Sequence, residues 1–387
     1  MSASDHTIRD ALFITGTRAD FGKLRPLMQV VEDSIDLRCL IFATGMHTQR
    51  RYGLTVEEIR KAGFKDIHTF HNQLPGEPMD LVLASTVAGL SRYVGERQPD
   101  LIVVHGDRLE ALAGAIVGAF RNILVAHVEG GELSGTIDEL IRHAVTKLSH
   151  THFVANDDAA QVLRQLGETE SSIYEIGSPD IDIMLSENLP SLETVTSRYE
   201  IPWFDFGIVL FHPVTTELEH LRGQVRALVD ALLGSRQNCL VIGPNNDPGS
   251  ETIFYEYRRL EGQPSVIVRP SLRFEHFLTA LKHAQFIVGN SSAGIREAPV
   301  YGVPSINIGT RQNNRYVHEG IINVPPVADK IAAAIGEAIA RPQIQPSAHF
   351  GDGKSAERFG EVLARDEFWK TPRQKQFLTL WDVTPER

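Results

Sequence analysis

A chain of 387 residues is longer than one ordinary hydrophobic core requires, so we expect two domains. Hydrophobic residues make up 42% of the chain and charged residues 22%, which is typical of a globular protein and excludes intrinsic disorder. The formal net charge of −11 argues against nucleic acid and anionic membranes as general partners, although local arginines and helix N-termini can still bind a small anion.

The cysteines and the N-terminal residues indicate the cellular compartment. Cys39 and Cys239 each lie in an apolar run, which predicts core residues rather than a disulfide framework or a zinc site. Residues 1–10 have no apolar segment of the kind found in signal peptides, and no run approaches the roughly 18 apolar residues of a membrane span. We therefore expect a cytoplasmic protein.

Short apolar runs recur along the chain, and most end in polar or glycine-rich residues. In chain order they occupy residues 11–20, 37–47, 101–107, 122–132, 150–156, 173–180, 206–214, 238–247, 265–272, 284–292 and 303–311. The segments between them often have helical periodicity, most clearly residues 108–122. One face of that segment carries Leu109, Leu112, Ile116 and Phe120. Apolar runs that alternate with helices predict parallel strands covered on both sides.

The runs form two series of β/α units. The break between them falls at residues 188–206, which contain two prolines and no strong apolar period. We predict two doubly wound α/β domains, residues 1–190 and 191–365, that face each other across a cleft. Residues 366–387 contain no further β/α unit and are expected to pack back on a domain surface. Because doubly wound sheets bind ligands beyond the carboxyl ends of their strands, the polar residues that end each run are the site candidates.

The first strand leads into a glycine-containing turn, TGTRADFGK, at residues 15–23. A turn of this kind that opens a helix and carries an arginine, here Arg18, suits a phosphate ligand. The glycine spacing fits neither a P-loop nor the G-x-G-x-x-G fingerprint. An ordinary β/α turn with a surface arginine is the alternative.

A second candidate phosphate site is GNSSAGIREA at residues 289–298. Ser291 and Ser292 lie at a predicted helix N-terminus, where hydroxyls, backbone N–H groups and the helix dipole favour phosphate. Glu297 lies further into the helix, where a carboxylate can accept ribose hydroxyls. A capped helix is the alternative, but it does not explain the two arginines after the next strand, Arg311 and Arg315.

Two strands end in a histidine that is followed two residues later by a carboxylate. These pairs are His105 and Asp107 in HGD, and His127 and Glu129 in HVEGGE. Side chains at i and i+2 point the same way in an extended chain, so all four are predicted to enter one crevice. Asp138 follows near a helix start and adds a third carboxylate. The alternative for the histidines is that they are polar strand-end residues whose hydrogen bonds are made within the protein. The alternative for Asp138 is that it caps a helix.

Other site types are less well supported. Imidazole and carboxylate are good metal ligands, but no HExxH or similar helix spacing occurs, so no metal is expected. His212 in FHPVTTE ends a strand of the second domain, from which it is predicted to face the first domain across the cleft.

Five long motifs resemble one family. They are TGTRADFGKL, HGDRLEALAGA, HVEGGELSGTIDELIRHAVTKLSH, FHPVTTE and GNSSAGIREAPVYGVPSINIGTRQNNR. Together they resemble the hydrolysing UDP-N-acetylglucosamine 2-epimerases of sialic acid biosynthesis, and the bacterial capsule-type enzymes most nearly. The resemblance covers residues 11–315. GTRADFGK departs from the GTR-Pro-Glu motif of the non-hydrolysing epimerases and agrees with the hydrolysing group.

The resemblance implies a GT-B fold with two Rossmann-like domains and the nucleotide sugar between them. It implies that UDP-N-acetylglucosamine and water are converted to N-acetylmannosamine and UDP, without a cofactor, by a homodimer or homotetramer. The implied catalytic residues are Asp107, Glu129, Asp138, His105, His127 and His212. The implied substrate or UDP contacts are Arg18, His47, Asn245, Ser291, Ser292, Glu297, Arg311 and Arg315.

Chemistry orders the steps of this reaction. The sugar C2–H is a poor acid because no carbonyl activates that carbon, so UDP is expected to leave first through an oxocarbenium-like state. Loss of H2 then gives a glycal, which adds water at C1 and a proton at C2 from the opposite face. The proton steps need two groups, one on each face of C2, and the sequence leaves open which carboxylate serves which step.

Two further interpretations remain. The same elimination can act on a UDP-linked diacetamido-trideoxyhexose of the legionaminic acid pathway. A non-catalytic nucleotide-sugar sensor can use the same fold, although a sensor needs none of the three carboxylates.

Overall fold

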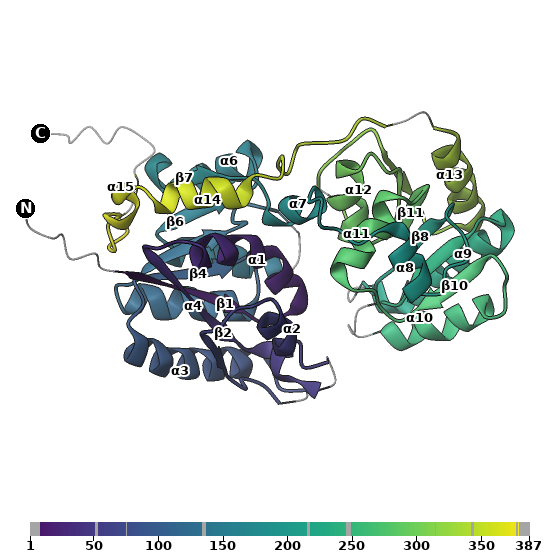
Figure 1. The fold of residues 1–387 in the computed structure, drawn as a ribbon. Coiled ribbons are helices and arrows are strands. Elements are labelled where there is room, and N and C mark those ends of the chain that lie inside the picture. The colour runs from purple at the N-terminus through teal and green to yellow at the C-terminus, as the bar shows by residue number, and fades with distance from the viewer. Residues whose placement is uncertain are drawn as a thin grey trace, which may run out of the picture. The chain divides into compact units, whose positions relative to one another are not determined.

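The computed structural model contains two parallel β-sheets, and helices cover both faces of each sheet (Figure 1). The structure describes residues 8–50, 53–74, 76–133, 137–214, 217–244, 249–313, 315–341, 344–376 and 378. The chain divides into a first unit, residues 1–185 with 349–387, and a second unit, residues 186–348. Within the described residues, no helix combines the length and the apolar character needed to cross a membrane.

The first unit is built on a seven-stranded sheet with the order β3-β2-β1-β4-β5-β6-β7. Its strands are β1 (Arg9–Thr15), β2 (Leu37–Ala43), β3 (Ile67–Thr69), β4 (Leu101–His105), β5 (Leu124–Val128), β6 (Thr151–Val154) and β7 (Ile173–Glu175). The order runs in one direction from β1 to β3 and in the other from β4 to β7. The switch point between β1 and β4 is where doubly wound sheets bind ligands.

Helices cover both faces of this sheet. They are α1 (Arg18–Glu32), α2 (Val56–Lys61), α3 (Met79–Arg97), α4 (Leu109–Phe120), α5 (Ile137–Leu148), α6 (Asp157–Gln165) and α7 (Pro179–Met184). Successive residues of β1 enter opposite cores because side chains alternate along a strand. Phe13 packs in the core that includes α1, whereas Leu12 and Ile14 pack in the core that includes α3, α4 and α5.

The predicted helix at residues 108–122 is present as α4, but its apolar face is only partly buried. Leu109 and Leu112 pack against the core that includes α3, α4 and α5, whereas the face that lies on the sheet carries smaller residues. Phe120 is 81% exposed, whereas Ala111, Ala115 and Val117 are buried against the sheet. A Cβ atom on Gly114 would lie 2.4 Å from Ile14 Cδ1, so a larger residue does not fit there. Small residues therefore face the strands because α4 lies very close to the sheet.

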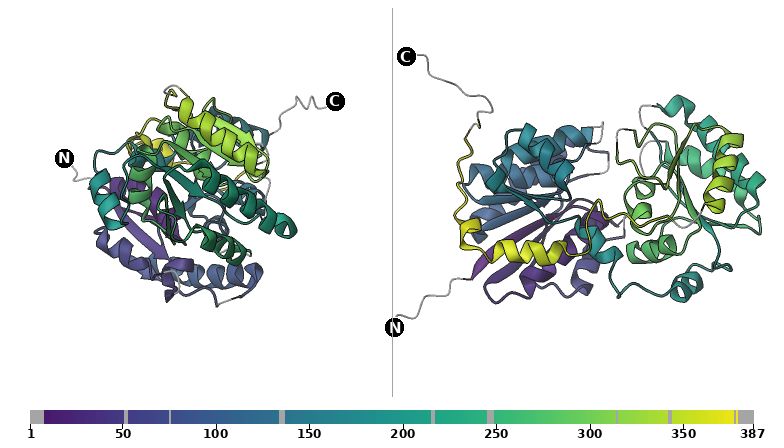
Figure 2. Two further views of the ribbon diagram at one scale, coloured as in Figure 1. Left: turned by 90° about the vertical axis from the view of Figure 1, so that its right-hand side faces the viewer. Right: turned by 90° about the horizontal axis from the view of Figure 1, so that it is seen from above.

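The C-terminal part of the chain returns to the first unit, as its yellow segment shows in Figure 2. We expected the second domain to continue to residue 365, and this boundary is wrong, because residues 349–365 belong to the first unit. The reason is α14 (Ser355–Leu363), which packs beside α1. Its Phe359 is fully buried, with ring centroids 6.4 Å from Phe13 and 4.8 Å from Phe153.

The described residues of the tail after residue 365 also pack on this unit. It begins with α15 (Asp366–Trp369), whose Phe368 and Trp369 are buried in the same core as Phe359. Further along, the Arg373 carbonyl oxygen lies 3.0 Å from His150 Nε2. Lys375 Nζ lies 2.5 Å from a carboxylate oxygen of Glu168.

The second unit has a six-stranded parallel sheet with the order β10-β9-β8-β11-β12-β13. Its strands are β8 (Gly207–Leu210), β9 (Cys239–Ile242), β10 (Val266–Arg269), β11 (Phe286–Gly289), β12 (Ser305–Ile308) and β13 (Ile321–Val324). Its helices are α8 (Leu192–Arg198), α9 (Leu218–Ser235), α10 (Ser250–Tyr257), α11 (Phe274–Lys282), α12 (Glu297–Val300) and α13 (Ala328–Ala340).

Two sequence predictions about cores and linkers can be checked here. Cys39 and Cys239 are both buried, free thiols, as predicted. The predicted break at residues 188–206 contains α8, whose Val195 is buried in the core of the second unit.

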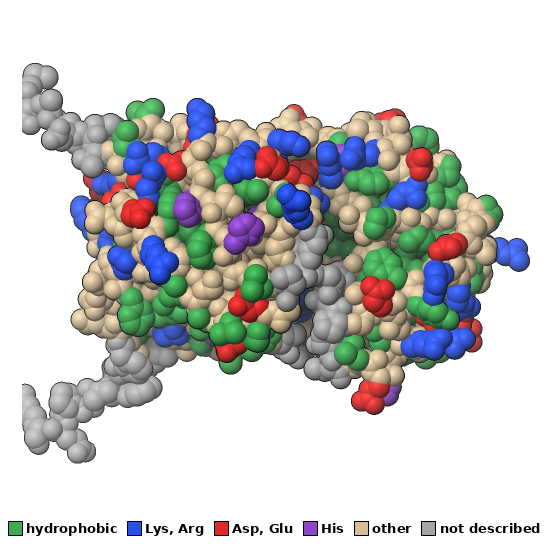
Figure 3. Space-filling model, turned by 90° about the horizontal axis from the view of Figure 1, so that it is seen from below, with side chains coloured by type: hydrophobic (Ala, Val, Ile, Leu, Met, Phe, Trp, Pro, Cys, Tyr) green, Lys and Arg blue, Asp and Glu red, His purple; other side chains and the backbone are tan. Residues whose placement is uncertain are grey.

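On the face drawn in Figure 3, acidic and basic side chains are interspersed over the first unit, on the left of the picture.

Candidate active site

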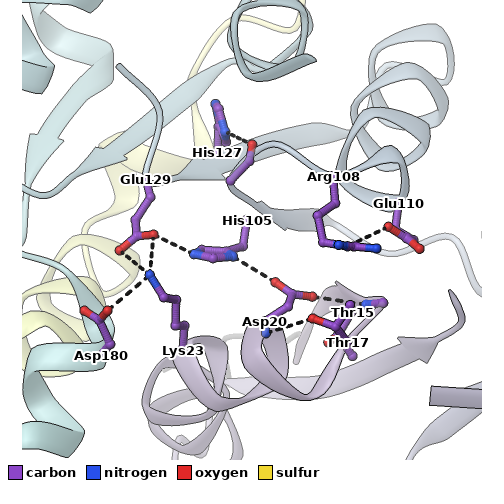
Figure 4. A network of polar contacts seen from close by, with 12 residues as sticks. Thr15, Thr17, Asp20, Lys23, His105, Arg108, Glu110, His127, Glu129 and Asp180 are labelled. Carbon is purple, nitrogen blue, oxygen red and sulfur yellow. Dashed lines mark hydrogen bonds and ion pairs between the residues drawn. The ribbon is translucent and has the colours of Figure 1, made fainter. Parts of the chain in front are cut away.

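The carboxyl ends of β1, β4 and β5 bring three ionisable side chains into a row (Figure 4). His105 ends β4, Asp20 lies in the first turn of α1, and Glu129 follows β5. The ring of His105 lies between the two carboxylates. Nδ1 is 2.8 Å from Asp20 Oδ1, and Nε2 is 2.9 Å from Glu129 Oε2.

A lysine and a serine also contact the Glu129 carboxylate. Lys23 Nζ lies 3.1 Å from Glu129 Oε2 and 3.1 Å from Asp180 Oδ2. Ser178 Oγ donates to Glu129 Oε1 and lies 2.6 Å from Asp180 Oδ1. Glu129 is therefore held by donors on both sides, and it is 5% exposed.

The two neighbours of His105 determine its charge. Burial opposes the protonated ring, but the hydrogen bonds and charges of Asp20 and Glu129 outweigh burial and raise the pKa of His105 to about 9. Burial likewise opposes ionisation of Asp20, yet the contact with His105 holds the pKa of Asp20 below its usual value. At neutral pH, His105 is therefore an imidazolium between two carboxylates.

Asp107 faces a different cation. Its carboxylate forms a close ion pair with Arg142 of α5, which also donates from Nη1 to the Glu132 carbonyl oxygen at 2.8 Å. Burial raises the pKa of Asp107, Arg142 opposes this shift, and the charge of Asp138 adds to it. Asp138 lies in the exposed first turn of α5, so both carboxylates occur at the same edge of the sheet.

His127 does not join the row of Asp20, His105 and Glu129. Its Nε2 lies 2.8 Å from the Gly106 carbonyl oxygen and its Nδ1 lies 3.1 Å from Thr146 Oγ1, with no exposed surface. Burial lowers the pKa of His127 well below its usual value, so the ring is neutral. The prediction that all four side chains enter one crevice is wrong. In the register of β4 and β5, His127 lies beside Val104 and His105 lies beside Val128, so the two histidines point to opposite faces of the sheet. Positive φ angles at Gly106 (67°) and Glu129 (59°) then end the alternation that would place each carboxylate on the face of its own histidine.

Arg18 and His47 lie near the end of β1. Arg18 opens α1, is partly exposed, and pairs with Glu58 at 2.5 Å. His47 is fully buried between Thr15 Oγ1 at 3.1 Å and Thr55 Oγ1 at 2.7 Å, and burial lowers its pKa to about 4. His47 therefore supports the turn after β2, whereas Arg18 is accessible to a ligand.

In the second unit, Asn290 connects two strand ends. Its Oδ1 accepts from His212 N at 2.7 Å, and its Nδ2 donates to His212 O at 2.8 Å. The Asn290 carbonyl oxygen accepts from Arg311 Nη1 at 3.0 Å and from Gln312 Nε2 at 2.8 Å. Burial, and then the charge of Arg311, lower the pKa of His212 to about 3, so this ring is neutral.

The remaining predicted UDP contacts lie in the same unit. Ser291 Oγ caps a three-residue 3-10 turn, Ser292–Gly294, by accepting from Ala293 N at 3.3 Å. In place of one continuous helix after Ser291, the chain forms this turn and then the four-residue α12, which begins with Glu297. Arg315 is partly buried, and Asn245 lies outside the described residues. Within the residues that the structure describes, no group of three or more His, Cys, Asp or Glu side chains can hold a metal ion.

Comparison with known proteins places the chain in a family. Residues 29–364 match the family described as UDP-N-acetylglucosamine 2-epimerase. The chain is 49% identical to the UDP-N-acetylglucosamine 2-epimerase of Neisseria meningitidis serogroup B, with 95% of this chain and 98% of that protein covered.

The chain belongs to the UDP-N-acetylglucosamine 2-epimerase family. It is also 33% identical to the UDP-N,N'-diacetylbacillosamine 2-epimerase (hydrolyzing) of Legionella pneumophila, with 92% of this chain and 96% of that protein covered.

Solved epimerase structures share the fold. A UDP-GlcNAc 2-epimerase from Neisseria meningitidis bound to UDP-GlcNAc aligns with a TM-score of 0.79 at 16% identity, over 92% of this chain and 99% of that chain. An enzyme from Methanocaldococcus jannaschii in complex with UDP-GlcNAc and UDP aligns with a TM-score of 0.78 at 21% identity, over 92% and 99%. The predicted fold class, two parallel-sheet α/β domains of the GT-B type, is confirmed.

Several residues of this epimerase-family chain that were not predicted from the sequence contact the predicted site residues. They are Asp20, Lys23, Arg142, Ser178 and Asn290, and Asp180 in turn contacts Lys23 and Ser178. Two signals were available for some of them. Asp20 and Lys23 are three residues apart at a helix start and so share a face. Asp180 ends an apolar run, as the predicted site residues do.

Proposed function

We propose that this chain is a hydrolysing UDP-N-acetylglucosamine 2-epimerase, which converts UDP-N-acetylglucosamine and water to N-acetylmannosamine and UDP without a cofactor. The observation that carries the proposal is the pair of dissimilar carboxylates at one sheet edge. Glu129 lies between the cations His105 and Lys23, whereas Asp107 has a raised pKa. Groups whose environments differ in this way suit opposite roles as base and acid. Relatives whose names include "hydrolyzing" support the hydrolytic outcome.

In the proposed reaction, the C1–O bond breaks as UDP leaves, and the base removes H2 to give 2-acetamidoglucal. Water then adds its oxygen to C1, and a protonated carboxyl group delivers a proton to C2 from the opposite face. The proton that water loses restores this carboxyl group, and the proton that the base took from C2 passes to solvent with the UDP anion. We assign the base to Glu129, because two cations keep its carboxylate ionised. We assign the acid to Asp107, assisted by Asp138, because burial favours its protonated form.

The second unit supplies the UDP contacts in this proposal. Arg311 and Arg315 stabilise the leaving diphosphate, and Ser291 and Ser292 add hydroxyl donors. Glu297 accepts the ribose hydroxyls. In this proposal Asn245 also contacts UDP, and Arg18 contacts the diphosphate. The product N-acetylmannosamine would supply sialic acid biosynthesis in the cytoplasm, and we propose a homodimer or homotetramer as the working form.

The deciding experiment is a proton NMR time course with UDP-N-acetylglucosamine in D2O, without added metal. We expect UDP and N-acetylmannosamine that carries deuterium at C2. Undeuterated N-acetylglucosamine with UDP would mean simple hydrolysis and would contradict elimination. Line-broadening of the nucleotide without any reaction would favour a sensor.

A different sugar is the second candidate, because relatives at 33% and 30% identity are named as diacetylbacillosamine 2-epimerases. UDP-N,N'-diacetylbacillosamine in the same assay separates the two. A larger kcat/KM for this substrate than for UDP-N-acetylglucosamine would transfer the proposal to it.

Replacement of Asn290 by alanine should weaken UDP binding about tenfold, because the two side-chain hydrogen bonds that fix the His212 backbone are lost. The Asn290 carbonyl oxygen, which accepts from Arg311, remains in the variant. Isothermal titration calorimetry with UDP measures the change. Asn238→Ala is the matched control, since Asn238 also donates to a backbone oxygen, at 3.1 Å, but lies at the amino edge of the same sheet. An unchanged Kd in Asn290→Ala would contradict the prediction.

A further inference from the structure

We propose that Asp20 is a positioning residue that acts through His105 to orient Glu129 and to supply it with a charged hydrogen-bond donor. This inference rests on the proposed function, because Glu129 is the base assigned there. Asp20 is separated from Glu129 by the full width of the imidazole ring, so it acts on the base only through His105 (Figure 4).

The geometry leaves His105 one arrangement. Both ring nitrogens have a carboxylate oxygen within 2.9 Å, and the side chain is 11% exposed, so a rotated ring would lose both contacts. The two flanking carboxylates come from different elements. Asp20 is fixed in the first turn of α1, and Glu129 follows β5, so His105 connects the helix to the strand end.

The two oxygens of Asp20 have different partners. Oδ2 accepts from Gly16 N at 3.1 Å, while Asp20 N donates to Thr17 Oγ1 at 3.1 Å, and these contacts resemble a helix-capping box. Oδ1 faces His105 instead. Capping explains the first oxygen only, so the second oxygen serves the histidine.

Charge explains why a carboxylate is needed at position 20. The ionisable groups around His105 and Glu129 come from α1, α7 and the ends of β4 and β5. They are Asp20, Lys23, Asp107, His127, Glu129 and Asp180. With Asp20 ionised, His105 stays protonated and donates to Glu129. Without that negative charge, the ring becomes neutral at lower pH and Glu129 loses a cationic donor.

The test is Asp20→Asn, with the dependence of kcat on pH as its readout. In the parent chain, activity should fall as pH rises through about 9, where His105 loses its proton. In Asp20→Asn, the pH at which activity falls should be about two pH units lower, so kcat at pH 8 should fall about tenfold while KM changes less than about threefold.

Thr17→Ala is the matched control, because it removes the capping contact and leaves Asp20 Oδ1 on His105. Both variants should melt at a lower temperature than the parent chain. In Thr17→Ala, however, kcat should fall at the same pH as in the parent chain. If kcat falls at the same pH in Asp20→Asn as in the parent chain, the inference is overturned.

A titration without substrate separates this inference from the proposed function. The imidazole signals of His105 in an NMR pH titration should move to a lower pKa in Asp20→Asn, whether or not the chain turns over any nucleotide sugar. If the parent chain has no turnover but this shift is seen, the proposed function fails and the contact of Asp20 with His105 stands. If the signals titrate alike in both chains, the inference fails.

Discussion

Replacement of Glu129 by glutamine should lower kcat by about 10²- to 10⁴-fold, the usual contribution of a positioned acid or base. Glutamine keeps the shape of the side chain and an oxygen for Ser178, so the fold should persist. It cannot take a proton from C2, and it removes the negative charge shared by Lys23 and His105. Steady-state release of UDP measures the effect, and the fraction of deuterium at C2 of the product shows whether proton transfer is the step that slows.

Glu175→Gln is the control for this prediction. Glu175 ends β7 of the same sheet, but it is exposed and lies two strands away from β5. Its kcat should equal that of the parent chain. A kcat for Glu129→Gln within threefold of the parent value would remove Glu129 from the proton steps and shift the assignment to Asp107 or Asp138.

Replacement of Phe359 by alanine should lower the free energy of unfolding by about 3–5 kcal/mol, the range for large aromatic side chains removed from a core. Phe359 has no exposed surface, and it packs against the rings of Phe13 and Phe153 on the sheet of the first unit. Denaturation with urea, followed by circular dichroism, measures the change. The prediction tests whether residues 349–365 are a part of the first unit's core.

Phe120→Ala provides the comparison, because the Phe120 side chain is 81% exposed on α4 of the same unit. Its effect should stay within about 0.5 kcal/mol, as for most surface substitutions. Equal effects of the two substitutions would contradict the assignment of Phe359 to the core.

Local pattern was sufficient for most of the strands and for much of the candidate site, but it did not predict the short edge strands β3 and β13. Each apolar run forms a strand that ends near the polar residue that followed it in the sequence. His105, Glu129 and Asp107 lie at strand ends, because a parallel sheet places all its carboxyl ends at one edge. The chain-order pattern also indicated two α/β units, since continuous apolar runs need helices on both faces of a sheet.

Other features depended on contacts between distant residues. The buried face of α4 is the face with small residues, because the distance between helix and sheet decides which side fits. Residues 349–365 join the first unit because Phe359 finds partners on β1 and β6, more than 190 residues earlier in the chain. The local periodicity of the sequence does not predict a contact between such distant residues.

By itself, the sequence determined the two α/β units, the family, and the strand ends at which the candidate carboxylates lie. Only the tertiary structure decided that His127 turns inward, that His105 lies between Asp20 and Glu129, and that Lys23 faces Asp180. The physical reason for the place of His127 is the register between neighbouring strands, which sets His127 beside Val104 and so on the opposite face from His105. In addition, strand periodicity predicts side-chain direction only while the chain stays extended. At Gly106 and Glu129 the backbone takes positive φ angles, and the partners of each side chain are then set by α1, α5 and α7.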